Sequence, residues 1–222
     1  MGIASKMLLL LLAFGIAGGW ASEVRASWVD EVRIKAENGD PFAQTTLGVC
    51  YELGEGLEKD TGRAFHWYGL AAQKGWAGGL VRLGKCYAGG IGVARDSRKA
   101  AALWLEAARI KAAPRSVQET HVQEARAYLA RALRLGEGVE QDTGKAIEMA
   151  TPAAEWGLPE AEYELGLCYL SEGPQKDMDK AVHWLARAGE GGIVEAAASL
   201  QRVQAAKART PEAPASPATP IN

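Results

Sequence analysis

The residues with the most evident chemical potential lie in a glycine- and acid-rich stretch, Gly54–Ala64 (GEGLEKDTGRA), which recurs at Gly136–Ala146 as GEGVEQDTGKA. Such a stretch could bind a metal ion or cradle a phosphate. A calcium loop needs carboxylates at alternating positions, and a phosphate loop needs Gly-Lys followed by Ser or Thr. The related stretches Gly89–Asp96 (GGIGVARD) and Ser171–Asp177 (SEGPQKD) supply neither pattern. We therefore interpret the stretch as a recurring turn, whose glycines adopt positive φ and whose Asp60 caps the next helix.

Histidines and cysteines are the other candidates for catalysis or metal binding: His66, His121, His183, Cys50, Cys86 and Cys168. They form neither a CxxC pair nor a His–Cys cluster, which argues against a zinc site. The cysteines share helical faces with apolar residues, so we predict that they are small core residues. A Cys50–Cys86 disulfide is disfavoured because neighbouring helices stack about 10 Å apart. We expect packing or surface histidines, no catalytic residue, no metal and no cofactor.

The charge distribution excludes one class of partner and leaves another open. A formal net charge of −2 over 222 residues gives no general attraction to nucleic acid or to an anionic membrane surface. One segment, 109–134, is locally basic, with Glu119 and Glu124 as its acids and the following cations: Arg109, Lys111, Arg115, Arg126, Arg131 and Arg134. This patch could bind an anionic partner, including an anionic polysaccharide, or simply be a solvated helix.

The elements that carry these residues are internal repeats. The stretch 43–75 aligns with 79–111, 125–157 and 161–192, and the alignment brings together Asp60, Asp96, Asp142 and Asp177. In the first copy, Ala43, Leu47, Cys50 and Tyr51 follow the spacing of one helical face. The second half of the copy repeats this spacing, and glycine and aspartate separate the halves.

Each copy is therefore expected to form two antiparallel helices, which we name helix A and helix B. One such pair cannot bury both of its faces, so the copies must stack. The predicted fold is all-α, a right-handed α-solenoid of stacked antiparallel helix pairs.

The expected organisation follows from these boundaries. We predict a capping helix at 27–39, and, within 40–205, four repeats at about 40–75, 76–111, 117–157 and 158–192. A C-terminal capping helix at 193–209 and a disordered Pro-rich tail at 210–222 follow. Pro114 with an S-x-x-E capping box at Ser116 and Glu119 predicts that helix A of the third copy starts early and is unusually long.

The N-terminus resembles a secretory signal. Lys6 precedes the apolar run Met7–Ile16, and small residues offer cleavage after Ala21 or as late as Ala26. The run is shorter than the roughly 20 residues of a spanning helix, although an uncleaved anchor is an alternative. We expect a signal peptide at 1–21, a periplasmic or secreted mature protein, and no stable membrane span after signal removal.

The repeated residues resemble the Sel1-like repeat, a relative of the tetratricopeptide repeat, in its exported bacterial type. The resemblance rests on Leu47-Gly48-x-x-Tyr51, the paired glycines, Asp60, and Ala64-x-x-Trp67 with the small residues that follow it. It implies an adaptor that holds other proteins in complexes. A cysteine-rich branch of the family is linked to β-lactam binding, but its paired cysteines within each repeat are missing from this chain.

The resemblance also implies a binding surface on the concave side formed by helices A. The matching positions are Thr45, Val49, Glu52, Val81, Lys85, Arg131, Arg134, Tyr163, Leu167 and Leu170. We expect a non-enzymatic scaffold or adaptor in the cell envelope that binds a segment of a protein partner there. The alternatives are a polysaccharide-binding envelope module that uses the basic patch, and a hydrolase of β-lactam or envelope polymer. The second lacks a constellation of polar residues in the sequence.

Overall fold

The computed structural model describes residues 28–209. The expected signal peptide and the Pro-rich tail lie outside the described residues. The chain divides into two compact units between Ala125 and Arg126.

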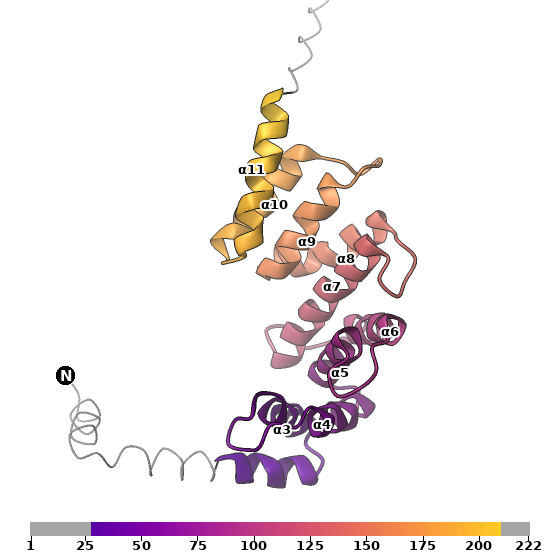
Figure 1. Cartoon of the computed structure of the whole chain (residues 1–222), viewed down its shortest axis with the longest axis vertical. Helices are drawn as coiled ribbons and strands as arrows, with labels where there is room; N and C mark the ends of the chain where they lie inside the picture. The colour runs from indigo at the N-terminus through magenta and orange to yellow at the C-terminus, as the bar shows by residue number, and fades with distance from the viewer. Residues whose placement is uncertain (1–27, 210–222) are drawn as a thin grey trace, which may run out of the picture. The chain divides into compact units, whose positions relative to one another are not determined.

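The described residues form helices and turns without a strand, which confirms the predicted all-α class. The first unit contains helix 28–37, α3 (Pro41–Leu53), α4 (Thr61–Gln73), α5 (Ala77–Gly89), α6 (Ser97–Ala108) and the start of α7 (Val117–Leu135), as Figure 1 shows. The second unit contains the rest of α7, then α8 (Thr143–Glu155), α9 (Pro159–Leu170), α10 (Met178–Glu190) and α11 (Val194–Arg209).

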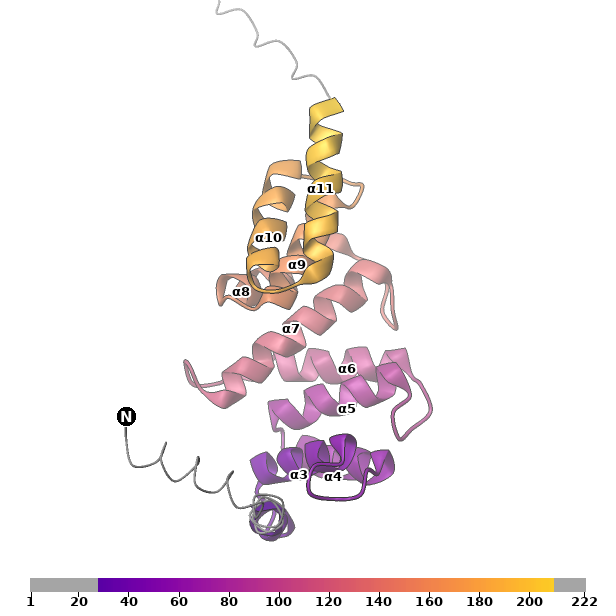
Figure 2. The ribbon, with the colours of Figure 1, turned by 60° about the vertical axis from the view of Figure 1, so that its left-hand side comes forward.

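Consecutive helices pack as pairs. Helix α3 contacts α4, α5 contacts α6, and α9 contacts α10. Figure 2 shows α3 beside α4 and α5 beside α6. Further contacts join α4 to α5 and α8 to α9, so within each unit the pairs stack in the manner of an α-solenoid. Helices α3, α5, α7 and α9 are the helices A, and α4, α6, α8 and α10 are the helices B.

The glycine- and acid-rich stretches are turns, as expected. Gly54 ends α3 with φ 78°, and Gly56 follows with φ 71°. Both angles lie in the left-handed region, where glycine has no Cβ penalty. Asp60 caps α4 by accepting a hydrogen bond from the Arg63 backbone N–H at 2.9 Å. Aspartate occupies the same N-cap position in α6, α8 and α10, so one capping arrangement starts every helix B.

Helices A and B approach each other through pairs of residues whose sizes compensate. A methyl group added at Gly48 would lie 2.6 Å from Cδ1 of Tyr68, and one added at Gly84 would lie 2.8 Å from Cδ1 of Trp104. In the fourth copy, a methyl at Gly166 would lie 2.8 Å from Cγ of Leu185.

The third copy solves the same packing problem differently. It has alanine on both sides, at Ala130 and Ala150, and both residues are fully buried. A large helix B residue therefore stands opposite glycine, and a small one stands opposite alanine. Helix α11 carries Gln201 at the corresponding position, and this residue is exposed.

Helix α7 spans 19 residues, which confirms the expected long helix A of the third copy. Ser116 caps it by accepting from the Glu119 backbone N–H at 3.1 Å. The Glu119 carboxylate accepts from the backbone N–H of Arg115 rather than from that of Ser116 itself. Arg115 has a positive φ of 58°, so the chain turns sharply just before the helix.

Candidate functional site

Two of the predicted surface residues are buried in the first unit. Thr45 is 7% exposed and Val81 is 1% exposed. The Thr45 hydroxyl donates to the Pro41 carbonyl of its own helix at 2.9 Å, so it packs as an apolar residue would. Neither side chain offers surface to a partner, and we leave both out of the proposed surface below.

Glu52 and Lys85, also predicted, belong to a charged network on α3, α5 and α7. The Tyr68 hydroxyl donates to Glu52 Oε2 at 2.5 Å, and Arg82 Nη1 lies 3.8 Å from the same oxygen. Burial, and then this hydrogen bond, raise the pKa of Tyr68 well above its usual range. Val49, another predicted residue on α3, is half-buried.

The network continues to α7, where His121 has a partner on its own helix. Its Nδ1 lies 3.1 Å from Glu124 Oε2. Burial acts to raise the pKa of Glu124, but the hydrogen bond and charge of His121, followed by the charges of Arg82 and Lys85, lower it overall. The positive charge of Arg82 therefore acts on two carboxylates, those of Glu52 and Glu124.

This arrangement predicts a specific acid sensitivity. Because the pKa of Glu124 is lower in the folded chain than its unfolded value of 4.5, its contribution to stability is present above about pH 4.5 and is lost as the pH falls through the folded value. Glu124→Gln should therefore lose less unfolding free energy between pH 6 and pH 3.5 than the parent chain. Urea unfolding at both pH values measures this, with Glu106→Gln on the exposed face of α6 as control. Equal losses for the parent and Glu124→Gln would contradict it.

The second unit contains two ion pairs with buried carboxylates, and of their four residues only Arg134 was predicted. Arg134 Nε donates to Oε2 of Glu164 at 2.9 Å, and Arg134 Nη2 lies 2.8 Å from the same oxygen. Arg187 Nη2 lies 2.6 Å from Glu162 Oε1. Glu162 aligns with Gln44 of the first copy, and both residues are buried. An acidic residue at this repeat position could therefore have indicated an ion pair from the sequence.

The other predicted residues of the second unit lie partly at the surface. Tyr163, Leu167 and Leu170 lie on α9 at helical spacing and are half-buried, and we call them the α9 strip. Arg131 on α7 is exposed, and its charge acts on Glu164 of α9. The strip and this cation therefore belong to neighbouring helices A.

The predicted basic patch is weaker than its count of cations indicated. Arg134 is largely buried against Glu164, so its charge is already compensated. Arg109, Lys111, Arg115 and Arg131 are exposed.

The cysteines and the remaining histidines behave as core and surface residues. Cys50, Cys86 and Cys168 are free and buried, as expected. Burial raises the pKa of Cys86 to about 11 and that of Cys168 to about 12, which keeps both thiols protonated and unreactive at neutral pH. The rings of His66 and His183 pack edge-to-face on the adjacent tryptophans.

Comparison with known proteins decides the family. The Sel1 repeat family model matches residues 41–76, 77–110, 123–157 and 159–193, more than half of the chain. The chain belongs to the Sel1 repeat family. The fold of Sel1 repeats commonly mediates protein–protein interaction, and the family is typically non-catalytic.

Two relatives illustrate the likeness. A Sel1 repeat protein from Oxalobacter formigenes, known from its crystal structure, is 28% identical and superposes with a TM-score of 0.63 over 81% of this chain and 50% of its own. A sel1-like repeat-containing protein of Acanthamoeba polyphaga mimivirus is 32% identical over 87 residues, which cover 39% of this chain and 16% of the relative. The chain thus spans half or less of the length of these Sel1 repeat relatives.

None of the Sel1 repeat helices between residues 28 and 209 combines the length and the apolar character that crossing a bilayer requires.

Proposed function

We propose that this Sel1 repeat chain is a non-enzymatic scaffold of the cell envelope that binds a segment of a partner protein on the surfaces of its helices A. The envelope location rests on the apolar run Met7–Ile16 with its preceding lysine and following small residues. The scaffold role rests on the family and on the side chains that its helices A present.

The α9 strip is the observation that carries the proposal. Tyr163, Leu167 and Leu170 keep part of their apolar surface in solvent, although α9 buries its other face in the core of the second unit. A partner that covers them gains about 25 cal/mol for each Å² of apolar surface that leaves water. A tyrosine among them adds a rigid anchor of the kind that dominates binding energy at interfaces.

The charges beside the strip indicate the character of the partner. Arg131 is exposed, whereas the neighbouring Arg134 is satisfied by Glu164. A partner segment with apolar residues and an acidic residue that reaches Arg131 would fit this surface. The charge pair would contribute mainly to orientation and to the rate of encounter.

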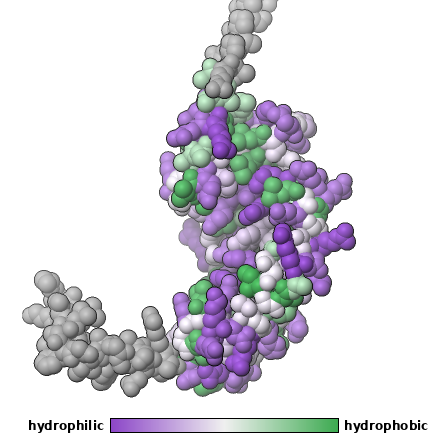
Figure 3. Space-filling model, viewed as in Figure 1, coloured by the Kyte–Doolittle hydropathy of each residue, from purple (hydrophilic) through white to green (hydrophobic). Residues whose placement is uncertain are grey.

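In the first unit, the corresponding surface is more polar. Val49, Glu52 and Lys85 are partly exposed there, and Glu52 is already held by Tyr68 and Arg82. In the view of Figure 3, apolar side chains form separate patches among hydrophilic ones. We therefore assign the stronger contact to the α9 strip and a weaker, polar contact to the first unit.

Site-specific photo-crosslinking in cells that naturally carry the chain tests this proposal. A photoreactive residue at Leu167 should give a discrete adduct with a partner protein, and Tyr163→Glu should abolish that adduct. A photoreactive residue at Glu148, exposed on the helix B α8, is the matched control and should give none. Adducts of equal yield from both positions, or none from Leu167, would contradict the proposed surface.

A further inference from the structure

A cavity of about 470 Å³ lies in the first unit, beside the first glycine- and acid-rich turn. Its walls come from helix 28–37, from the end of α3, from the turn itself and from the first turn of α4. The side chains that shape it are Arg33, Tyr51, Leu57, Glu58 and Arg63. Its lining includes neither the α9 strip nor Val49, Glu52 and Lys85 of the proposed function.

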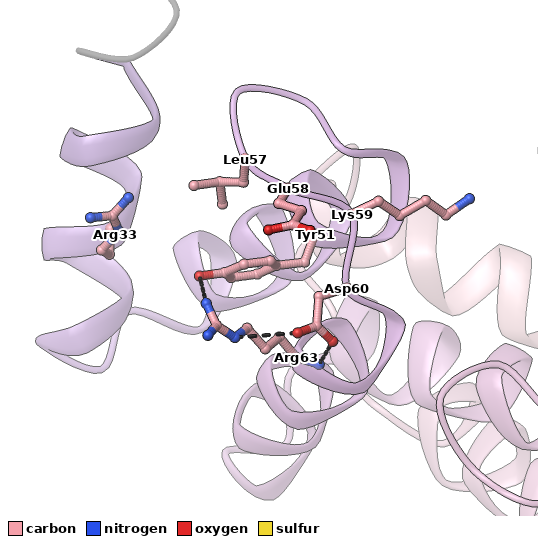
Figure 4. Close-up of a pocket in the computed structure, with 7 residues that line it drawn as sticks. All are labelled: Arg33, Tyr51, Leu57, Glu58, Lys59, Asp60 and Arg63. Carbon is pink, nitrogen blue, oxygen red and sulfur yellow. Dashed lines mark hydrogen bonds and ion pairs between the residues drawn. The ribbon is translucent and has the colours of Figure 1, made fainter.

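Two guanidinium groups reach this cavity from opposite sides. Figure 4 shows Arg33 on helix 28–37 across the cavity from Tyr51 and Arg63. Arg63 donates through Nη1 to the Tyr51 hydroxyl at 3.4 Å, and its Nε lies 3.3 Å from Asp60 Oδ2. Arg33 Nη2 lies 3.2 Å from Asp30 Oδ1, which is outside the cavity wall. A guanidinium has five N–H donors, so both arginines keep donors for a ligand.

The Tyr51 ring forms one wall of the cavity. The residue is only 9% exposed, and the Arg63 guanidinium lies 5.5 Å from the ring centroid. The hydroxyl accepts from Arg63 and keeps its own hydrogen, which it can donate to an anion. The guanidinium therefore has two partners at this wall, the tyrosine and Asp60.

The other copies show that the fold itself does not need this pair of arginines. Lysine replaces Arg63 at the equivalent positions Lys99 and Lys180, where it lies 5.2 Å over Tyr87 and Tyr169 respectively. Such a lysine also pairs with the capping aspartate. Gly69, Leu105 and Thr151 occupy the positions equivalent to Arg33 in the second, third and fourth copies. Only the first copy thus combines two guanidinium groups at this place among the described repeats.

We propose that this cavity binds a carboxylate group of a partner peptide between Arg33 and Arg63. A carboxylate can accept two parallel N–H bonds from a guanidinium, a geometry that an ammonium group does not offer. The wall carries three cations, Arg33, Lys59 and Arg63, and two carboxylates, Glu58 and Asp60, while Asp30 beside Arg33 brings the local formal charge close to zero. A carboxylate adds one negative charge to this nearly neutral site, whereas a phosphate dianion would add two.

NMR titration of the full chain tests the proposal through the Nε–H signals of its arginines. N-acetylglycine, which has a free terminal carboxylate, and N-acetylglutamate α-amide, which has only a side-chain carboxylate, should both shift the Arg33 and Arg63 signals in a saturable way. N-acetylglycinamide has no carboxylate and should not. The relative affinities of the two acids tell whether the cavity prefers a chain terminus or an acidic side chain.

Variants distinguish the site from general charge attraction. Arg33→Gln should weaken carboxylate binding about tenfold, which corresponds to the loss of one charge-assisted hydrogen bond. Arg63→Lys keeps the cation that the other copies place over tyrosine, so the fold should persist while binding weakens. Arg98→Gln, at an exposed position of α6, should leave carboxylate binding unchanged. Absence of saturable shifts, undiminished binding by Arg33→Gln, or tighter binding of inorganic phosphate than of either acid would overturn the proposal.

Discussion

Replacement of Arg134 by methionine should lower the free energy of unfolding by about 3–5 kcal/mol, because it leaves the Glu164 carboxylate buried without its partner. The side chains of Arg134 and Glu164 are only 17% and 10% exposed, so water cannot replace the lost hydrogen bonds. Urea unfolding at pH 7 measures the loss. Arg131→Met, at an exposed position on the same helix, is the control and should cost less than about 0.5 kcal/mol.

The double variant Arg134→Met with Glu164→Leu separates the buried charge from lost packing. Apolar residues of similar size often replace a buried ion pair without loss, so the double variant should be more stable than Arg134→Met alone. A cost for Arg134→Met no larger than that for Arg131→Met would show that the pair contributes nothing.

The same pair has a predictable dependence on pH. Burial raises the pKa of Glu164, and Arg134 opposes this effect. A carboxyl group whose folded pKa is raised favours the folded state below the unfolded pKa, and this contribution is lost as the pH rises through the folded pKa. Removing Arg134 raises the folded pKa further. The deficit of Arg134→Met relative to the parent should therefore shrink as the pH is lowered toward 4.

The second large effect concerns the size-compensating pair Gly48 and Tyr68. Tyr68→Ala should cost about 3–5 kcal/mol because it empties a fully buried position. Gly48→Ala should cost about 1–3 kcal/mol because the new methyl group overlaps the Tyr68 ring.

Combining the two changes reproduces the alanine pair that the third copy has at Ala130 and Ala150. The cost of the double variant should be smaller than the sum of the single costs by at least about 0.5 kcal/mol, since the two residues are in contact. Strictly additive costs, measured by thermal or urea unfolding, would contradict size compensation as the rule that joins helix A to helix B.

The recurrence of residues explains why much of the fold was predictable. Asp60 and its equivalents mark the start of every helix B, and the paired glycines mark the end of α3, because an N-cap and a left-handed residue are local requirements. Ser116 and Glu119 likewise predicted the long helix α7. Local requirements of this kind can be recognised from a few residues that are adjacent in the sequence.

The site was less predictable because it depends on how neighbouring helices face each other. The pairing of Arg134 with Glu164 joins residues on two helices A, and no local pattern sets which face of α7 meets α9. Thr45 and Val81 were expected at the surface by analogy with tetratricopeptide positions, yet both are buried. The cavity between Arg33 and Arg63 needed the placement of helix 28–37 against the first turn.

The most direct test of the scaffold function is the crosslinking yield from the α9 strip compared with that from α8. The proposal predicts a discrete partner adduct from a photoreactive residue at Leu167, its loss in Tyr163→Glu, and no adduct from Glu148. An adduct at Leu167 that survives Tyr163→Glu, or equal yields from the two positions, would contradict it.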